Sequence, residues 1–214
     1  MQRIRRGIGV LTAVLTVVLG GMTVTAEPAA AAVTCSTTSG HCYSALRGTG
    51  TTFYGQYGTW GRAAMNAPGA NSSNKYFIDS EIWASLTPST SYAVETGLTQ
   101  GYFAVPGAVG YYAFGAYTKT SGAYAEHNFG LVTQSASVTD EYQISRNATS
   151  NKWNVYFDGK LWTTPDVGFW SVGCLDTGGE VFASKGAASK FTMYVKGITS
   201  SGGKVNLGTQ TTIR

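Results

Sequence analysis

Short strand-like segments separated by turn signals recur along this chain, and this pattern limits its fold more than any other feature. Turn signals occur about every 8–12 residues, and Asp158-Gly159 and the tract Ser200–Gly203 are examples. The composition is rich in Gly, Thr, Ser, Tyr and Trp and poor in Leu, Glu and Lys, and no window shows helical periodicity. The pattern therefore predicts an all-β chain of about a dozen short strands, arranged as a two-sheet sandwich or a barrel.

The first 32 residues have the features of a secretory signal peptide. Three arginines open the chain, an apolar core follows, and Ala29–Ala32 supplies small residues for cleavage. The apolar core is shorter than the about 20 residues that a membrane span needs. We expect residues 1–32 to be removed, which leaves residues 33–214 as a single β-sandwich domain. This domain is expected to be secreted, monomeric and free of the membrane after cleavage.

The charge and histidine content of that domain argue against several functions. Without residues 1–32, 12 basic and 10 acidic residues remain, a net charge of about +2. No basic cluster of the kind that phosphate contacts need is present, so we expect no nucleic-acid partner. The only histidines, His41 and His127, lack neighbours at metal-ligand spacing, and no Gly-x-Ser-x-Gly elbow occurs. We expect neither a metal nor a cofactor.

Three cysteines are present in the chain. Cys35 and Cys42 enclose a short polar loop and, in an exported protein, are expected to form a disulfide with each other. Cys174 would then be a small buried side chain. Pairing of Cys174 with either N-terminal cysteine, or a reactive thiol at this position, stays open.

Two glutamates within predicted strands are the best candidates for chemistry. In the predicted strand 91–99, Glu95 shares a face with Ala93, Gly97 and Thr99, so it is the only charge among very small side chains. Glu180 stands in a similar setting, the segment TGGEVFAS. Glycine at such places lets a substrate or another backbone approach closely. We predict Glu95 and Glu180 as catalytic residues, while a solvent-facing position is the alternative for each.

Aromatic side chains are numerous enough to line a groove for an extended peptide or a polysaccharide. The predicted ligand-binding residues are Trp60, Trp83, Tyr111 and Tyr112, and Trp153 and Trp162 are further candidates. Core packing is the alternative for each of them taken singly. His127 is predicted to hydrogen-bond a carboxylate of the site, with a plain surface position as its alternative.

Two stretches of this sequence resemble the glutamic peptidases, or eqolisins. Ile82–Ala84 followed by Val94–Gly97 is similar to a Trp-containing strand followed by a Gln-Thr-Gly strand in that family. Gly179–Phe182, followed by Lys190–Met193, is similar to the eqolisin strand with the catalytic glutamate and the Phe-Thr strand after it. The position of Glu95 is a glutamine in eqolisins, whereas the neprosin-type peptidases use two glutamates, so this chain looks more like the second arrangement.

The resemblance, which runs in order from about Trp60 to Ile198, implies a concanavalin A-like jelly roll and an acid-acting endopeptidase. Two carboxyl groups brought close together cannot both ionise cheaply, so one of them keeps its proton. Glu180 would be the general base that activates a water molecule, and Glu95 the acid or oxyanion partner. The surrounding family signature is missing, so membership of either family stays open.

Two other functions remain open on the same fold. One is a non-catalytic module that binds a carbohydrate or a cell-wall component, since Asn154–Lys160 resembles a hairpin frequent in lectin-like domains. The other is a glycoside hydrolase in which Asp79 or Glu81 faces Glu95 across a groove. A retaining enzyme of that kind needs two carboxyl groups about 5 Å apart.

Overall fold

The structure is a computed structural model that describes residues 28–31, 34–35, 41–48, 53–87, 92–170, 172–182, 186–188, 191–207 and 210–213. Every regular element in these residues is a β-strand, which confirms the predicted all-β class. This part of the chain contains no helix with the length and apolar character needed to cross a membrane.

Sheet 1 has the strand order β1-β15-β4-β10-β11-β12, with β16 paired to β15, and its pairs are antiparallel. Its strands are β1 (Pro28–Ala31), β4 (Gly55–Arg62), β10 (Ser135–Asn147), β11 (Lys152–Phe157), β12 (Lys160–Thr163), β15 (Phe191–Ile198) and β16 (Lys204–Val205). Between β11 and β12, Asp158 and Gly159 both adopt positive φ, at 48° and 70°. These angles suit a two-residue hairpin, so the predicted Asp-Gly turn is confirmed.

Sheet 2 has the strand order β17-β3-β13-β6-β7-β8-β9 and is also antiparallel. Its strands are β3 (His41–Gly48), β6 (Phe77–Ser85), β7 (Ala93–Phe103), β8 (Ala108–Thr118), β9 (Tyr124–Leu131), β13 (Cys174–Phe182) and β17 (Gln210–Ile213). A small third sheet joins β2 (Thr34–Cys35), β14 (Gly186–Ala188) and β5 (Met65–Asn66). The predicted strand around Glu95 therefore exists, as β7.

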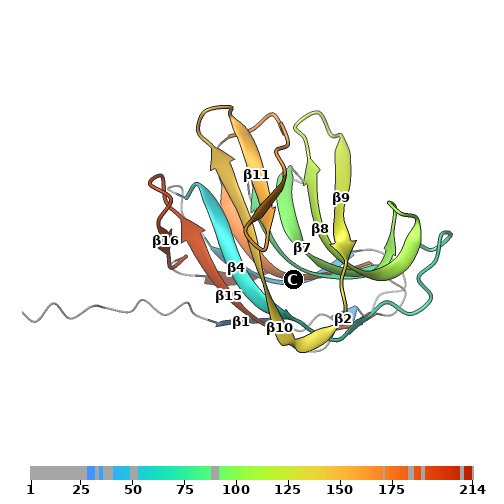
Figure 1. The fold of residues 1–214 in the computed structure, drawn as a ribbon. Helices are drawn as coiled ribbons and strands as arrows, with labels where there is room; N and C mark the ends of the chain where they lie inside the picture. Colours follow the sequence, from blue (N-terminus) through green and yellow to red (C-terminus); the bar gives the residue numbers. More distant parts are fainter. Residues whose placement is uncertain are drawn as a thin grey trace, which may run out of the picture.

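The two sheets pack face to face around one main hydrophobic core, with β4, β10, β11 and β15 in one layer and β7, β8 and β9 in the other (Figure 1). Sheet 1 contributes Trp60 and Ile144 to this core, and sheet 2 contributes Ile82 and Leu98. The indole N–H of Trp60 also donates to Ser80 Oγ across the two sheets, at 3.1 Å. The predicted two-sheet antiparallel β-sandwich is thus confirmed.

Two N-terminal predictions fall partly on residues outside the described ranges. β1 lies within the predicted signal peptide and pairs with β15 at the edge of sheet 1, while residues 1–27 are not described. Cleavage after residue 32 therefore stays a prediction. The side chain of Cys35 is also outside the description, so its disulfide with Cys42 stays a prediction. Cys174 is a free and fully buried thiol, in agreement with its expected role as a small core residue.

Candidate active site

Strand alternation gives sheet 2 one face toward the core and one face turned away from sheet 1. In β6, Ile78 and Ile82 belong to the core, so Asp79, Glu81 and Trp83 point to the outward face. The register of the sheet then brings in residues from distant parts of the chain. Glu180 of β13 is paired with Asp79, and Glu95 of β7 is paired with Trp83.

This outward face holds a pocket of about 440 Å³. Its lining consists of His41, Tyr43, Arg47, Phe77, Asp79, Glu81, Trp83, Ser85, Ala93, Glu95, Thr118, Tyr124, Glu126 and Glu180. The structure therefore brings three of the predicted site residues to one pocket, namely Glu95, Glu180 and Trp83. It surrounds them with further acids, so the pocket is strongly acidic.

A trio of carboxylates lies close together within this acidic set. One carboxylate oxygen each of Asp79, Glu81 and Glu180 lies within 4.8 Å of the other two. Asp79 and Glu81 are only 6% and 2% exposed. Across the sheet, Glu81 is paired with Gly97 on one side and Gly178 on the other. Neither neighbour has a side chain, which leaves space above Glu81.

Gly97 is required by the close approach of β6 and β7. A Cβ atom at this position would lie 2.7 Å from Glu81 Cα, a backbone atom that cannot move aside without shifting the strand. Gly97 lies on the same face of β7 as Glu95 and leaves room beside it. In the structure the same glycine also sets the spacing between Glu95 on β7 and Glu81 on β6.

His41 is the basic partner of Glu180. Its Nδ1 atom is hydrogen-bonded to Glu180 Oε1, and this bond raises the pKa of His41 above its ordinary value, although burial opposes the rise. The raised pKa favours the protonated imidazole, which places a positive charge beside Glu180. Tyr43 lies beside them, and burial together with the charge of Glu180 raises its pKa.

Three carboxyl groups of the pocket, those of Glu95, Asp79 and Glu81, have raised pKa values. Burial, with added repulsion from Glu180 and Glu126, raises the pKa of Glu95 to about 8. Burial also raises the pKa of Asp79 and that of Glu81 well above the ordinary range. The second cause is the negative charge of Glu180 for Asp79, and the negative charge of Glu95 for Glu81. The pocket therefore contains carboxyl groups that keep their protons at a pH where an ordinary carboxyl group is ionised, as a general acid must.

We expect the stability of the protein to fall as the pH rises through about 8. Glu95 binds its proton more tightly in the folded chain, with a pKa of about 8, than in an unfolded chain, where it is about 4.3. Its stabilising effect is therefore complete below about pH 4.3 and is lost as the pH rises through the folded pKa. Thermal unfolding between pH 4 and 9 should show this fall. The plot of Tm against pH should have a shallower slope for Glu95→Gln than for the wild type. Glu141→Gln, on the exposed face of sheet 1, should keep the wild-type slope, and identical slopes in all three proteins would contradict the assignment.

Two more acids near the pocket already have strong partners. Asp176 accepts two hydrogen bonds of 2.7 Å from the Arg47 guanidinium, from Nε and from Nη2. Glu126 accepts a hydrogen bond of 2.7 Å from the Tyr124 hydroxyl at the β9 side of the pocket. The remaining carboxyl groups that line the pocket are those of Asp79, Glu81, Glu95 and Glu180.

The structure corrects the prediction that Trp60 and Tyr111 bind ligand. Trp60 is 1% exposed and stacks on Tyr142 with ring centroids 3.9 Å apart. Tyr111 belongs to the same core and donates from its hydroxyl to the Ala63 carbonyl at 3.0 Å. Trp153, a further candidate, is fully buried too. All three side chains point between the sheets, where strand alternation places every second residue.

Tyr112 and His127 are also corrected, because neither lines the pocket. Tyr112 packs in a separate cluster with Phe103, Phe114 and Ala116. His127 follows Glu126 by one residue and so points to the opposite face, where its ring stacks on Tyr117 at 5.6 Å. The last candidate, Trp162, stacks on Phe129 away from the pocket.

Sequence reasoning undervalued the trio and missed the role of His41. Asp79 and Glu81 were considered only for a glycosidase, and His41 was set aside for lack of metal-binding neighbours. One local signal was available, because two acids at positions i and i+2 of a strand must share a face. The contact of His41 with Glu180 had no local signal, since the two residues are 139 positions apart.

No protein-family model matches this chain, and no curated protein matches its sequence. Several solved structures are similar to this chain at low identity. Scytalido-glutamic peptidase, solved with a peptide-based transition-state analogue, is 10% identical over 82% of this chain and 87% of its own, with a TM-score of 0.44. The alginate lyase AlyC3 is 12% identical over 79% and 75%, with a TM-score of 0.45. The β-glucanase of Bacillus licheniformis is 16% identical over 70% and 67%, with a TM-score of 0.41.

Proposed function

We propose that this protein is a secreted, acid-acting hydrolase that cleaves peptide bonds with a pair of glutamates, Glu180 and Glu95. The observation that carries the proposal is a single pocket that holds both glutamates, Glu180 hydrogen-bonded to a histidine and Glu95 with a raised pKa. The His41 imidazole is hydrogen-bonded to Glu180, while the pKa of Glu95 is raised to about 8. The choice of a peptide substrate rests on the sequence resemblance at Val94–Gly97 and Gly179–Phe182.

In this proposal Glu180 takes a proton from a water molecule, and the resulting hydroxide attacks the carbonyl carbon of the substrate. The protonated Glu95 donates a hydrogen bond to the carbonyl oxygen and stabilises the negative charge that develops there. When the tetrahedral intermediate collapses, the C–N bond breaks and Glu180 returns its proton to the leaving amine. Glu81 lies on β6, between the strand of Glu180 (β13) and the strand of Glu95 (β7), and is a further protonated acid beside the pair.

The first test is hydrolysis of a denatured protein by the purified secreted chain between pH 3 and pH 9. We expect cleavage in acid and a loss of activity as Glu95 gives up its proton at about pH 8. Oligosaccharides with β-linked sugars are the parallel substrates. Cleavage of the sugars and not of the protein would move the assignment to a glycoside hydrolase, since the trio oxygens within 4.8 Å also suit that chemistry.

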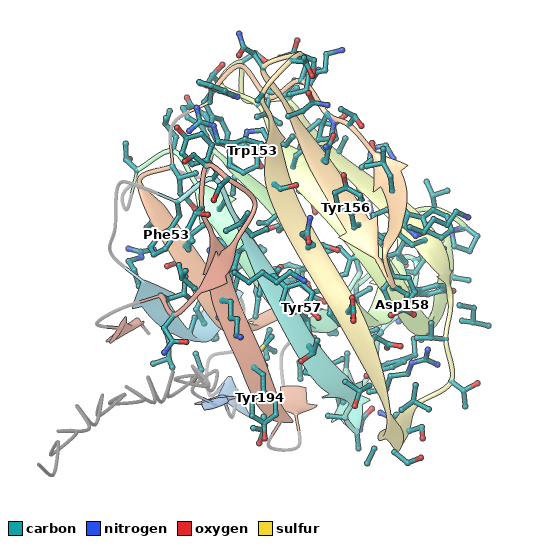
Figure 2. All side chains as sticks on the ribbon, turned by 60° about the vertical axis from the view of Figure 1, so that its left-hand side comes forward. Phe53, Tyr57, Trp153, Tyr156, Asp158 and Tyr194 are labelled. Atoms are coloured by element: carbon teal, nitrogen blue, oxygen red, sulfur yellow. The ribbon has the colours of Figure 1, made fainter. Side chains whose placement is uncertain are left out.

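Binding of a carbohydrate without catalysis is the second candidate, and a surface of sheet 1 favours it. Tyr57, Gln143 and Tyr156 form one row across β4, β10 and β11 on the face away from the core, and they line a hollow of about 240 Å³. Figure 2 shows Tyr57 and Tyr156 on this face, with Tyr194 farther along it. Tyrosine rings with an amide between them suit a sugar chain, but Lys204 Nζ lies 3.1 Å from the centroid of the Tyr57 ring and would have to move. A folded protein that hydrolyses nothing at any pH yet binds glycans would favour this candidate.

A further inference from the structure

The proposed hydrolysis does not require the convergence of three carboxylates, Asp79, Glu81 and Glu180. Hydrolysis needs one base and one acid, whereas here three carboxylates converge so that one oxygen from each lies within 4.8 Å of the others. Among the described residues, His41 is the basic side chain hydrogen-bonded to the trio, through Glu180. Three like charges at this spacing repel one another strongly unless a cation or protons neutralise them.

A second observation is the unsatisfied oxygen of Asp79. Its side chain is only 6% exposed and lines the acidic pocket. Within the described part of the chain, its Oδ1 atom is buried and accepts no hydrogen bond. Buried polar atoms in folded proteins nearly always have a partner, so an orphaned oxygen on a carboxylate that lines a pocket points to a ligand there.

The size and chemistry of the trio select the kind of ligand. Calcium binds oxygen ligands at about 2.3–2.6 Å, so two oxygens on opposite sides of the ion lie at most about 5 Å apart. The trio falls within this limit without any movement of the backbone. All three donors are carboxylate oxygens, which suit calcium, magnesium and manganese rather than softer metals. The open side of the pocket leaves room for water molecules to complete the coordination.

We propose that Asp79, Glu81 and Glu180 bind a hard divalent cation of the calcium type. The sequence predicted no metal because local spacing shows only two of the three ligands, and the third arrives through the register of β13 with β6. The cation site does not depend on the proposed hydrolysis. The effect of the cation on activity does rest on the proposed function. A cation bound to Glu180 would block the general base and inhibit the enzyme.

The test is calcium binding by isothermal titration calorimetry at pH 7.5, with CaCl₂ and MgCl₂ as separate titrants. The variant Asp79→Asn has nearly the same shape and lacks one ligand charge. Glu126→Gln is the matched control, because it removes the same charge from the same pocket outside the trio. We expect a one-to-one calcium isotherm for the wild type, an affinity at least tenfold lower in Asp79→Asn, and a change of less than threefold in Glu126→Gln.

A measurement on the wild type alone guards against a variant that fails to fold. Terbium is a luminescent substitute for calcium, and Trp83 in the same pocket can sensitise it. Terbium emission excited through tryptophan should appear on binding and should disappear when calcium is added. No calcium isotherm at millimolar concentrations, or equal losses of affinity in Asp79→Asn and Glu126→Gln, would overturn the proposal. Neither readout uses hydrolysis, so a failed cation site and a failed hydrolase remain distinguishable.

Discussion

Glu180→Gln is expected to lower kcat/KM for acid hydrolysis by about 10²–10⁴-fold, the range that a general acid–base residue contributes. Glutamine has the size of glutamate and keeps a hydrogen bond to His41 possible, but it cannot take a proton from water. Glu95→Gln should lower kcat/KM by a smaller factor, because an amide N–H can still donate to the carbonyl oxygen of the substrate. In that variant the loss of activity near pH 8 should disappear, since the amide that replaces the Glu95 carboxyl group does not ionise there.

The control for this pair is Glu126→Gln, which removes one charge from the pocket rim and should retain most of the activity. Kinetics should be measured together with the thermal unfolding of each variant, so that a loss of fold is separated from a loss of chemistry. Full activity in a folded Glu180→Gln protein would rule out Glu180 as the base. An unchanged alkaline limit in Glu95→Gln would remove Glu95 from the role of acid.

Trp60→Ala is expected to destabilise the fold by about 3–5 kcal/mol, the usual cost of truncating a buried tryptophan. Trp60 is 1% exposed, stacks on Tyr142 and donates to Ser80 on the opposite sheet, so its removal leaves a cavity between the layers. Urea unfolding followed by circular dichroism measures the change. Trp162→Ala is the matched control. Trp162 is 36% exposed, so its truncation should lower the stability much less.

The Trp60→Ala variant also tests whether Trp60 binds ligand or belongs to the core. If Trp60 contacted substrate, Trp60→Ala would raise KM and leave stability close to that of the wild type. A core role gives the opposite result, a large loss of stability with a smaller effect on KM in whatever protein remains folded. Trp83→Ala provides the comparison, because Trp83 lines the pocket and is expected to change KM.

The all-β class and the surroundings of Glu95 followed from sequence alone because their causes are local. Turn residues at regular intervals separate the strands, and the Asp158-Gly159 hairpin depends only on two residues that accept positive φ. Strand alternation put Glu95 on a face with Ala93, Gly97 and Thr99, and the structure has this face. Period-two alternation also places Asp79 and Glu81 side by side on one strand.

Only the tertiary structure decided which face of each strand is buried and which strands meet. Alternation divides Tyr111 and Tyr112, or Glu126 and His127, between two faces, but it does not say which face the other sheet covers. The convergence of Glu180 with Asp79 and Glu81 depends on the register of β13 with β6, strands about 100 residues apart in the chain. Such long-range pairing is selected by the packing of the whole sandwich, so the acidic trio has no signature within any short stretch of sequence.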